Sequence, residues 1–127
     1  MAFRGILTVA VLAATAAACG SSSSSPSPSS TTPPPTSSAS AAVSIPMNAR
    51  TLTTTAFGTN PLVVSVGTTV TWTNNDTISH DSVADGGTWN SGILAAGQSF
   101  PFKFTTAGTF TYKCTLHPNM VGTITVQ

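Results

Sequence analysis

Four side chains in this sequence have the chemistry to bind a metal ion together. Cys114, His117 and Met120 follow one another at intervals of three residues near the C-terminus. The only other histidine, His80, lies earlier in the chain. A thiolate, a thioether and two imidazoles are ligands that transition metals prefer over the hard oxygen ligands of magnesium or calcium. The sequence therefore predicts one metal site formed by these four residues.

This set of ligands favours copper. Two histidines and one cysteine in a trigonal set, with a weak axial methionine, are typical of copper sites that transfer electrons. A structural zinc site needs four strong ligands. Methionine is a poor zinc ligand, and Asp81 is the residue that zinc would have to recruit beside His80. We predict one copper ion that carries single electrons, because a site held between the geometries of Cu(I) and Cu(II) rearranges little on electron transfer.

Each of these residues, taken alone, has a more ordinary interpretation. Cys114 is compatible with an inert buried thiol, His117 with a surface residue and Met120 with core packing. In an exported protein, Cys114 is also compatible with a disulfide to Cys19, the other cysteine. The three residues occur together at one strand end, and this combination favours the metal site.

Alternation of apolar and polar residues predicts the elements that position the ligands. Phe110, Tyr112 and Cys114 share one face of a strand, and Met120 opens the next strand in phase with Ile124. We expect a tight turn containing Pro118 to join the two strands and to carry His117. One hairpin end would then direct three ligands to one point, while His80 follows a separate strand and turn.

The same period of two recurs along the rest of residues 43–127 and predicts an all-β domain. Apolar rows are expected at Val70 and Trp72, at Phe100, Phe102 and Phe104, and at Leu62, Val64 and Val66. Turn signals rich in Gly, Asn, Asp and Pro separate these rows. No stretch of residues 43–127 has a convincing helical period. We predict a β-sandwich or barrel of seven to eight short strands. A domain of about 85 residues is only marginally stable, so a bound metal would help to stabilise it.

The N-terminal part of the chain has a different composition. Residues 1–19 combine Arg4, a short apolar stretch and small residues, as in an export signal. Ala16-Ala17-Ala18-Cys19 resembles a bacterial lipobox, in which Cys19 is lipidated, although Leu is more usual where Ala16 stands. Conventional signal cleavage is the alternative. We expect an exported, periplasmic or extracytoplasmic protein that lipid on Cys19 anchors to a bacterial membrane.

Residues 20–42 are almost entirely Ser, Thr, Pro, Ala and Gly. Such a segment has too little apolar surface to fold, so it is predicted to be a disordered tether or a simple spacer. Residues 43–127 are then the copper domain.

Charged residues are scarce throughout the sequence. It has four Lys and Arg, three Asp and no Glu, and a formal net charge of +1. No basic stripe is available, so nucleic acid is excluded as a partner. Electrostatic steering would be weak, and we expect a monomer that docks transiently with redox partner proteins through apolar contacts.

These motifs resemble the cupredoxin family, in its plastocyanin and amicyanin branch. The resemblance covers Val70-Thr71-Trp72-Thr73-Asn74, His80, Ser91-Gly92-Ile93-Leu94, Ala107-Gly108-Thr109-Phe110 and Cys114-x-x-His117-x-x-Met120. It implies a Greek-key β-sandwich with a type 1 blue copper at one end. It also implies electron transfer through the edge of His117, with Leu116 and Pro118 in the surrounding docking patch.

The chain departs from the family pattern beside the first histidine. Ser79 and Asp81 stand where the family usually has Pro and Asn. That Asn commonly ties the two ligand loops together, and Asp81 is expected to do so by accepting a hydrogen bond from Thr115. An ionised Asp81 near copper would favour Cu(II) and lower the reduction potential. Leu116 also replaces a Pro that is frequent in the short ligand loop.

Two other functions were weighed from the sequence. A copper carrier or buffer that delivers metal to another protein would be favoured by clusters of Met or His, whereas Met47 is isolated. An enzyme would need an open coordination position or a second metal site, and both histidines already serve the first. We therefore expect an electron carrier rather than an enzyme.

Overall fold

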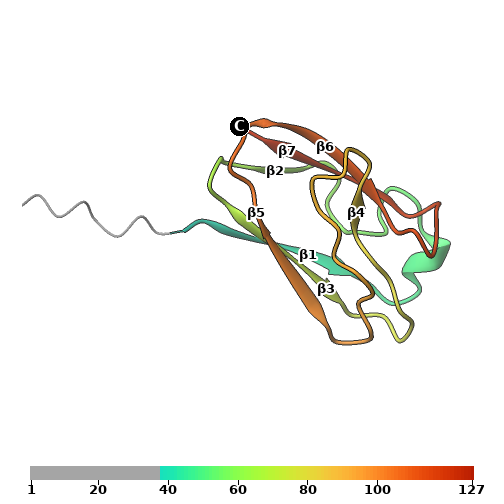
Figure 1. The fold of residues 1–127 in the computed structure, drawn as a ribbon. Coiled ribbons are helices and arrows are strands. Elements are labelled where there is room, and N and C mark those ends of the chain that lie inside the picture. Colours follow the sequence, from blue (N-terminus) through green and yellow to red (C-terminus); the bar gives the residue numbers. More distant parts are fainter. Residues whose placement is uncertain (1–37) are drawn as a thin grey trace, which may run out of the picture. The chain divides into compact units, whose positions relative to one another are not determined.

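The computed structural model describes residues 38–127, which form two β-sheets packed face to face (Figure 1). The elements in chain order are β1 (Ser40–Ile45), a short 3-10 helix η1 (Ala49–Thr51), β2 (Leu62–Val64), β3 (Thr69–Asn74), β4 (Val83–Ala84), β5 (Ser99–Lys103), β6 (Gly108–Lys113) and β7 (Val121–Val126). None of the helices found in residues 38–127 has the length and hydrophobicity needed to cross a membrane.

The strand order confirms the predicted Greek-key β-sandwich. One sheet has the order β1-β3-β5 and the other the order β2-β7-β6-β4. The pairs β1–β3 and β2–β7 are parallel, and the remaining pairs are antiparallel. From β1 to β6, each strand lies in the opposite sheet from the one before it, so the connections cross between the layers. The seven strands agree with the predicted number.

The core forms where the inward faces of the two sheets meet. Val70 and Trp72 of β3 are fully buried, and so is Ile124 of β7, as the alternation predicts. The Trp72 ring lies 5.2 Å from that of Trp89 and meets the edge of Tyr112 at 5.7 Å, measured between ring centroids. Large aromatic side chains therefore fill the space between the sheets.

One expected feature of the strands was wrong. Val66 is 48% exposed, because β2 ends at Val64 and the chain then turns to hydrogen-bond the Val66 N–H to the Gln127 carbonyl. Phe100, Phe102 and Phe104 share the inward face as predicted, although only Phe104 is fully buried. A regular alternation gives the face of a side chain but not how far the opposite sheet covers it.

Strand β1 begins at Ser40, three residues before residue 43, where the copper domain was predicted to start. Ser40, Ala41 and Ala42 pair with Thr69–Thr71 as the first half of β1. Backbone pairing needs no apolar side chain, so Ser and Ala residues suffice to extend the strand. The predicted export signal, the lipidation site Cys19 and nearly all of the predicted tether lie outside the described residues.

Candidate metal centre

The hairpin between β6 and β7 carries three of the four predicted ligands. Cys114 follows the last residue of β6, and Met120 directly precedes β7 rather than lying within it. The Cys114 N–H donates to the Met120 carbonyl at 3.0 Å, and the Met120 N–H donates to the His117 carbonyl at 2.9 Å. These bonds close the loop, so its backbone is held at both ends.

His80 comes from a separate loop after β3, as predicted. His80 and Leu94 exchange two backbone hydrogen bonds, of 3.1 and 2.8 Å, in an isolated bridge. The buried Asn74 amide donates to the carbonyls of Ile78 at 2.8 Å and Leu94 at 2.9 Å. Hydrogen bonds to both of its flanks therefore hold the loop that carries His80.

The ligand atoms of His80, Cys114 and His117 all lie within 4.8 Å of one another. Cys114 Sγ is 3.8 Å from His80 Nδ1 and 3.6 Å from His117 Nδ1. Metal–ligand bonds of about 2.0–2.3 Å at trigonal angles separate the ligand atoms by roughly 3.6 Å. The three side chains therefore have the chemistry and the spacing for one metal ion with trigonal ligation.

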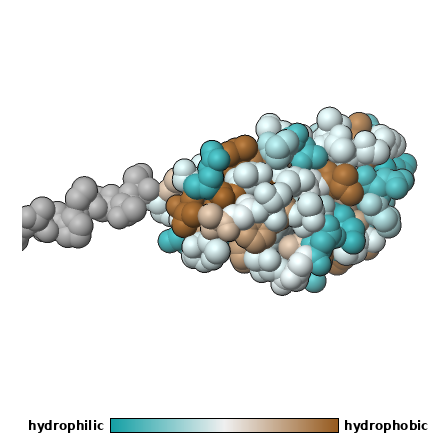
Figure 2. Space-filling view, turned by 90° about the horizontal axis from the view of Figure 1, so that it is seen from above, coloured by the Kyte–Doolittle hydropathy of each residue, from teal (hydrophilic) through white to brown (hydrophobic). Residues whose placement is uncertain are grey.

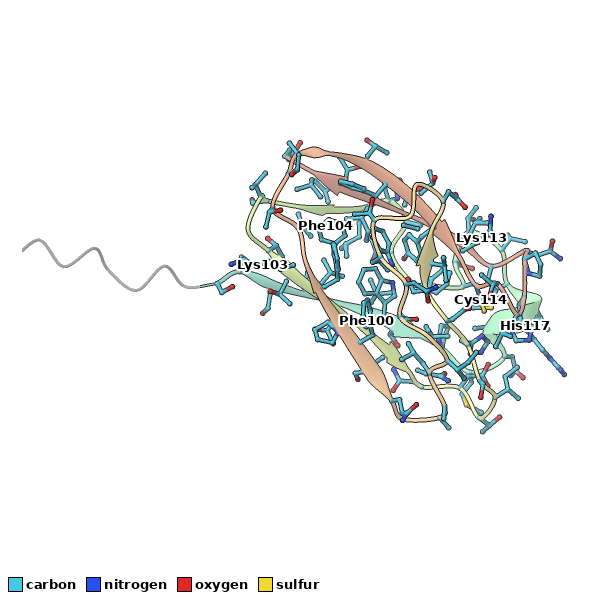
Figure 3. All side chains as sticks on the ribbon, viewed as in Figure 1. Phe100, Lys103, Phe104, Lys113, Cys114 and His117 are labelled. Atoms are coloured by element: carbon cyan, nitrogen blue, oxygen red, sulfur yellow. The ribbon has the colours of Figure 1, made fainter. Side chains whose placement is uncertain are left out.

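The ligands differ in their access to solvent. His80, Cys114 and Met120 have no exposed surface, whereas His117 is half-buried. Leu116 is 46% exposed, and Pro118 on the other side of His117 is also exposed. Figure 3 shows Cys114 and His117 at one end of the sandwich, far from Lys103 at the other end. One imidazole, flanked by apolar groups, thus connects the site with the surface.

Asp81 ties the two ligand loops together, which confirms the predicted contact. Its carboxylate accepts a hydrogen bond of 2.5 Å from the Thr115 N–H and a second one from the Thr115 hydroxyl. Its own N–H donates to Cys114 Sγ at 3.4 Å. Burial raises the pKa of the Cys114 thiol, whereas the hydrogen bond from the Asp81 N–H lowers it, and burial has the larger effect. A metal that binds here therefore has to displace the thiol proton.

The sequence analysis missed one carboxylate beside the site. Asp76 Oδ2 lies 3.1 Å from His80 Nε2, and both side chains are buried. Burial opposes ionisation of Asp76, but hydrogen bonds from His80, Thr77 and Ala49 outweigh it and lower its pKa to about 2. The sequence predicted only a turn here. Its position four residues before His80, in a chain with three carboxylates, was the available signal.

The chain was compared with known proteins. Residues 45–127 match the family model described as copper binding proteins, plastocyanin/azurin family. A plastocyanin from Scenedesmus fuscus is 38% identical, over 56% of this chain and 86% of that protein. An amicyanin from Paracoccus denitrificans is 34% identical, over 56% of this chain and 58% of that protein, so the chain spans less than two thirds of that relative.

Comparison with solved structures supports the same family. The solved structure of a purple cupredoxin from Nitrosopumilus maritimus superimposes with a TM-score of 0.63 at 35% identity, and the match covers 68% of this chain and 99% of that one. The chain therefore belongs to the cupredoxins, the plastocyanin/azurin family of copper-binding proteins, and the metal for which its site is built is copper.

Proposed function

We propose that this protein is a type 1 blue copper protein that carries single electrons between redox partners. Its copper ligands are His80, Cys114 and His117, with Met120 as the weak axial ligand. The observation that carries the proposal is the trigonal cluster of three ligand atoms within 4.8 Å, of which one imidazole reaches the surface. Copper bound there supplies the one-electron couple between Cu(II) and Cu(I).

The protein holds the ligands in fixed positions and excludes water from them. Backbone bonds close the loop of Cys114 and Met120, and the His80–Leu94 bridge fixes the other loop. Because these bonds lie within the backbone and do not involve the metal ligand atoms, the ligands keep nearly the same positions in both oxidation states. Full burial of His80 and Cys114 also keeps water from the trigonal positions. Both features lower the rearrangement that accompanies each electron transfer.

Electrons enter and leave through the half-buried edge of His117. The neighbouring Leu116 and Pro118 form an apolar rim on which a redox partner docks transiently. Figure 2 shows a face made mostly of residues of intermediate hydropathy, with hydrophilic and hydrophobic residues scattered among them, and the sequence has few charged residues. Weak electrostatic steering and a small docking surface favour rapid dissociation. Both suit a monomer that has to release its partner after each electron transfer.

We further propose that the protein works outside the cytoplasm, anchored to a bacterial membrane by lipid on Cys19. The export-signal composition of residues 1–19 supports this location. Ser40 pairs with Thr69 at one end of β3, whereas the other end of β3, at Asn74, holds the loop of His80. Strand β1 thus begins at the end of the sandwich remote from His117.

A copper carrier or buffer is the alternative. Handing over the metal requires ligands that a partner can reach, and three of the four ligands here are fully buried. This burial favours the electron carrier. The same burial of His80, Cys114 and Met120 favours a carrier over an enzyme, because an enzyme would need an open coordination position.

Voltammetry and electron self-exchange test the proposal on the copper-loaded protein. We expect a reversible one-electron wave, and NMR line broadening that depends on concentration in mixtures of the Cu(I) and Cu(II) forms. Copper held through repeated redox cycles, with little loss to a Cu(I) chelator, would separate the electron carrier from the copper carrier. An irreversible wave with release of copper on reduction would contradict the proposal.

A further inference from the structure

Asp76 has no role in the ligation described above, yet it is one of three carboxylates and it is buried beside a ligand. Its Oδ2 accepts one hydrogen bond from the Ala49 N–H at 3.1 Å. The same oxygen lies 3.1 Å from His80 Nε2. Its Oδ1 accepts the Thr77 N–H at 2.7 Å, with the Thr77 hydroxyl at 3.4 Å. Three donors, the Ala49 N–H and the N–H and hydroxyl of Thr77, thus hold the carboxylate in place. The imidazole of His80 is its fourth partner.

These contacts determine which nitrogen of His80 carries the proton. An ionised carboxylate only accepts hydrogen bonds, so Nε2 must donate to Asp76. In a neutral imidazole, the other nitrogen then has a free lone pair. That nitrogen is Nδ1, which lies 3.8 Å from Cys114 Sγ, on the side where the ligand atoms gather.

We propose that Asp76 is a positioning residue of the copper site. It holds His80 with the proton on Nε2 and Nδ1 directed to the metal, and its negative charge reaches copper through the imidazole. A carboxylate hydrogen-bonded to a metal-ligating histidine raises the basicity of that ligand and fixes the orientation of the ring. The inference rests on the proposed ligation by His80. It predicts that the site prefers Cu(II) over Cu(I) more strongly with the charge of Asp76 than without it.

The first test needs no copper, so it remains informative if the proposed function fails. Two-dimensional NMR of the metal-free full chain, labelled with nitrogen-15, assigns the proton on each imidazole. We expect a proton on Nε2 of His80 that exchanges slowly, because the Asp76 contact is buried. A proton on Nδ1 of His80 in the wild-type protein would overturn the proposal.

The second test measures how the charge acts on copper. Asp76→Asn keeps the size of the side chain and removes its charge, and Asp85→Asn makes the same change at an exposed pair with Lys113. We expect Asp76→Asn to reduce the preference for Cu(II) about tenfold, which raises the reduction potential by about 59 mV for one electron. Asp85→Asn should leave the potential nearly unchanged.

Equal potentials in wild type and Asp76→Asn, or equal shifts in both variants, would overturn the proposal. A purely structural role of Asp76 would lower the thermal stability of the protein without moving the potential, and it would also count against the proposal. If Asp76→Asn does not fold, the NMR measurement on the wild-type protein decides the question alone.

Discussion

Asp81 accepts two hydrogen bonds from Thr115, one from the backbone N–H and one from the hydroxyl, and so joins the two loops that carry the metal ligands. The same residue donates its N–H to the sulfur of Cys114. One side chain therefore links the loop after His80 with the loop of Cys114, and its charge lies close to the thiolate. This link helps to hold the ligands in place.

Asp81→Asn tests the effect of that charge. The amide oxygen still accepts the Thr115 N–H, and the amide NH2 can donate to the Thr115 hydroxyl oxygen, so the substitution removes the negative charge and keeps the link between the loops. Because an anion near copper favours Cu(II), we expect the reduction potential to rise. Voltammetry measures the change, with Asp85→Asn as the control for net charge. An unchanged potential would contradict an electrostatic role of Asp81.

Leu116→Glu tests the docking rim beside His117. Leu116 is 46% exposed, and two copies of the variant would bring like charges together when they meet through this face. We expect electron self-exchange to slow by roughly tenfold or more at low salt and to recover partly as salt is added. Val63→Glu is the matched control, because Val63 is 52% exposed and lies in β2, which pairs with the end of β7 remote from Met120.

The NMR line widths of mixed Cu(I) and Cu(II) samples give the self-exchange rate. Equal slowing in the two variants would show that the apolar rim has no special part in docking.

Gly122→Ala tests the packing beneath the ligand hairpin. A Cβ at Gly122 would lie 2.3 Å from Tyr112 Cζ, so the buried ring would have to move. Overpacking of this kind costs typically 1–3 kcal/mol, and urea unfolding of the metal-free protein measures the loss in its free energy of unfolding. Gly86→Ala is the control, because nothing lies within 4 Å of the added Cβ there. Equal stabilities of the two variants would contradict the close packing of Tyr112.

The stability of the metal-free protein should fall in acid. The pKa of Asp76 is lowered from 3.8 to about 2 in the folded state, so the unfolded state binds the proton more readily. The stabilisation is present above about pH 4 and is lost as the pH falls toward 2. Thermal unfolding across this range should show a weaker pH dependence in Asp76→Asn. An identical pH dependence in wild type and variant would contradict the assignment.

Much of the site follows from local sequence. Cys114 and His117 lie within one hairpin end, so the alternation of the flanking strands was enough to predict that their ligand atoms lie close together. The link between Asp81 and Thr115 was also predictable, because Asp81 stands where the family has a residue with that role. The strand faces of Val70 and Trp72 followed from the same alternation.

The failures involve contacts between distant segments. Val66 continues an apolar row, but its exposure depends on where β2 ends and on the backbone of Gln127. Asp76 was assigned only to a turn, because its contact with Ala49 depends on the pairing of β1 with β3, which are far apart in the sequence. Side-chain burial and long-range hydrogen bonds are set by the packing of the sheets, which a pattern along one segment does not contain.

The visible and electron paramagnetic resonance spectra of the Cu(II)-loaded protein, beside those of Cys114→Ser, test the central claim most directly. A thiolate bound to Cu(II) gives an intense visible band and a narrow copper hyperfine splitting. We expect both in the wild-type protein and neither in the variant. A pale wild-type sample with the wide splitting of ordinary Cu(II) would show that Cys114 is not a ligand, and the proposed electron carrier would be wrong.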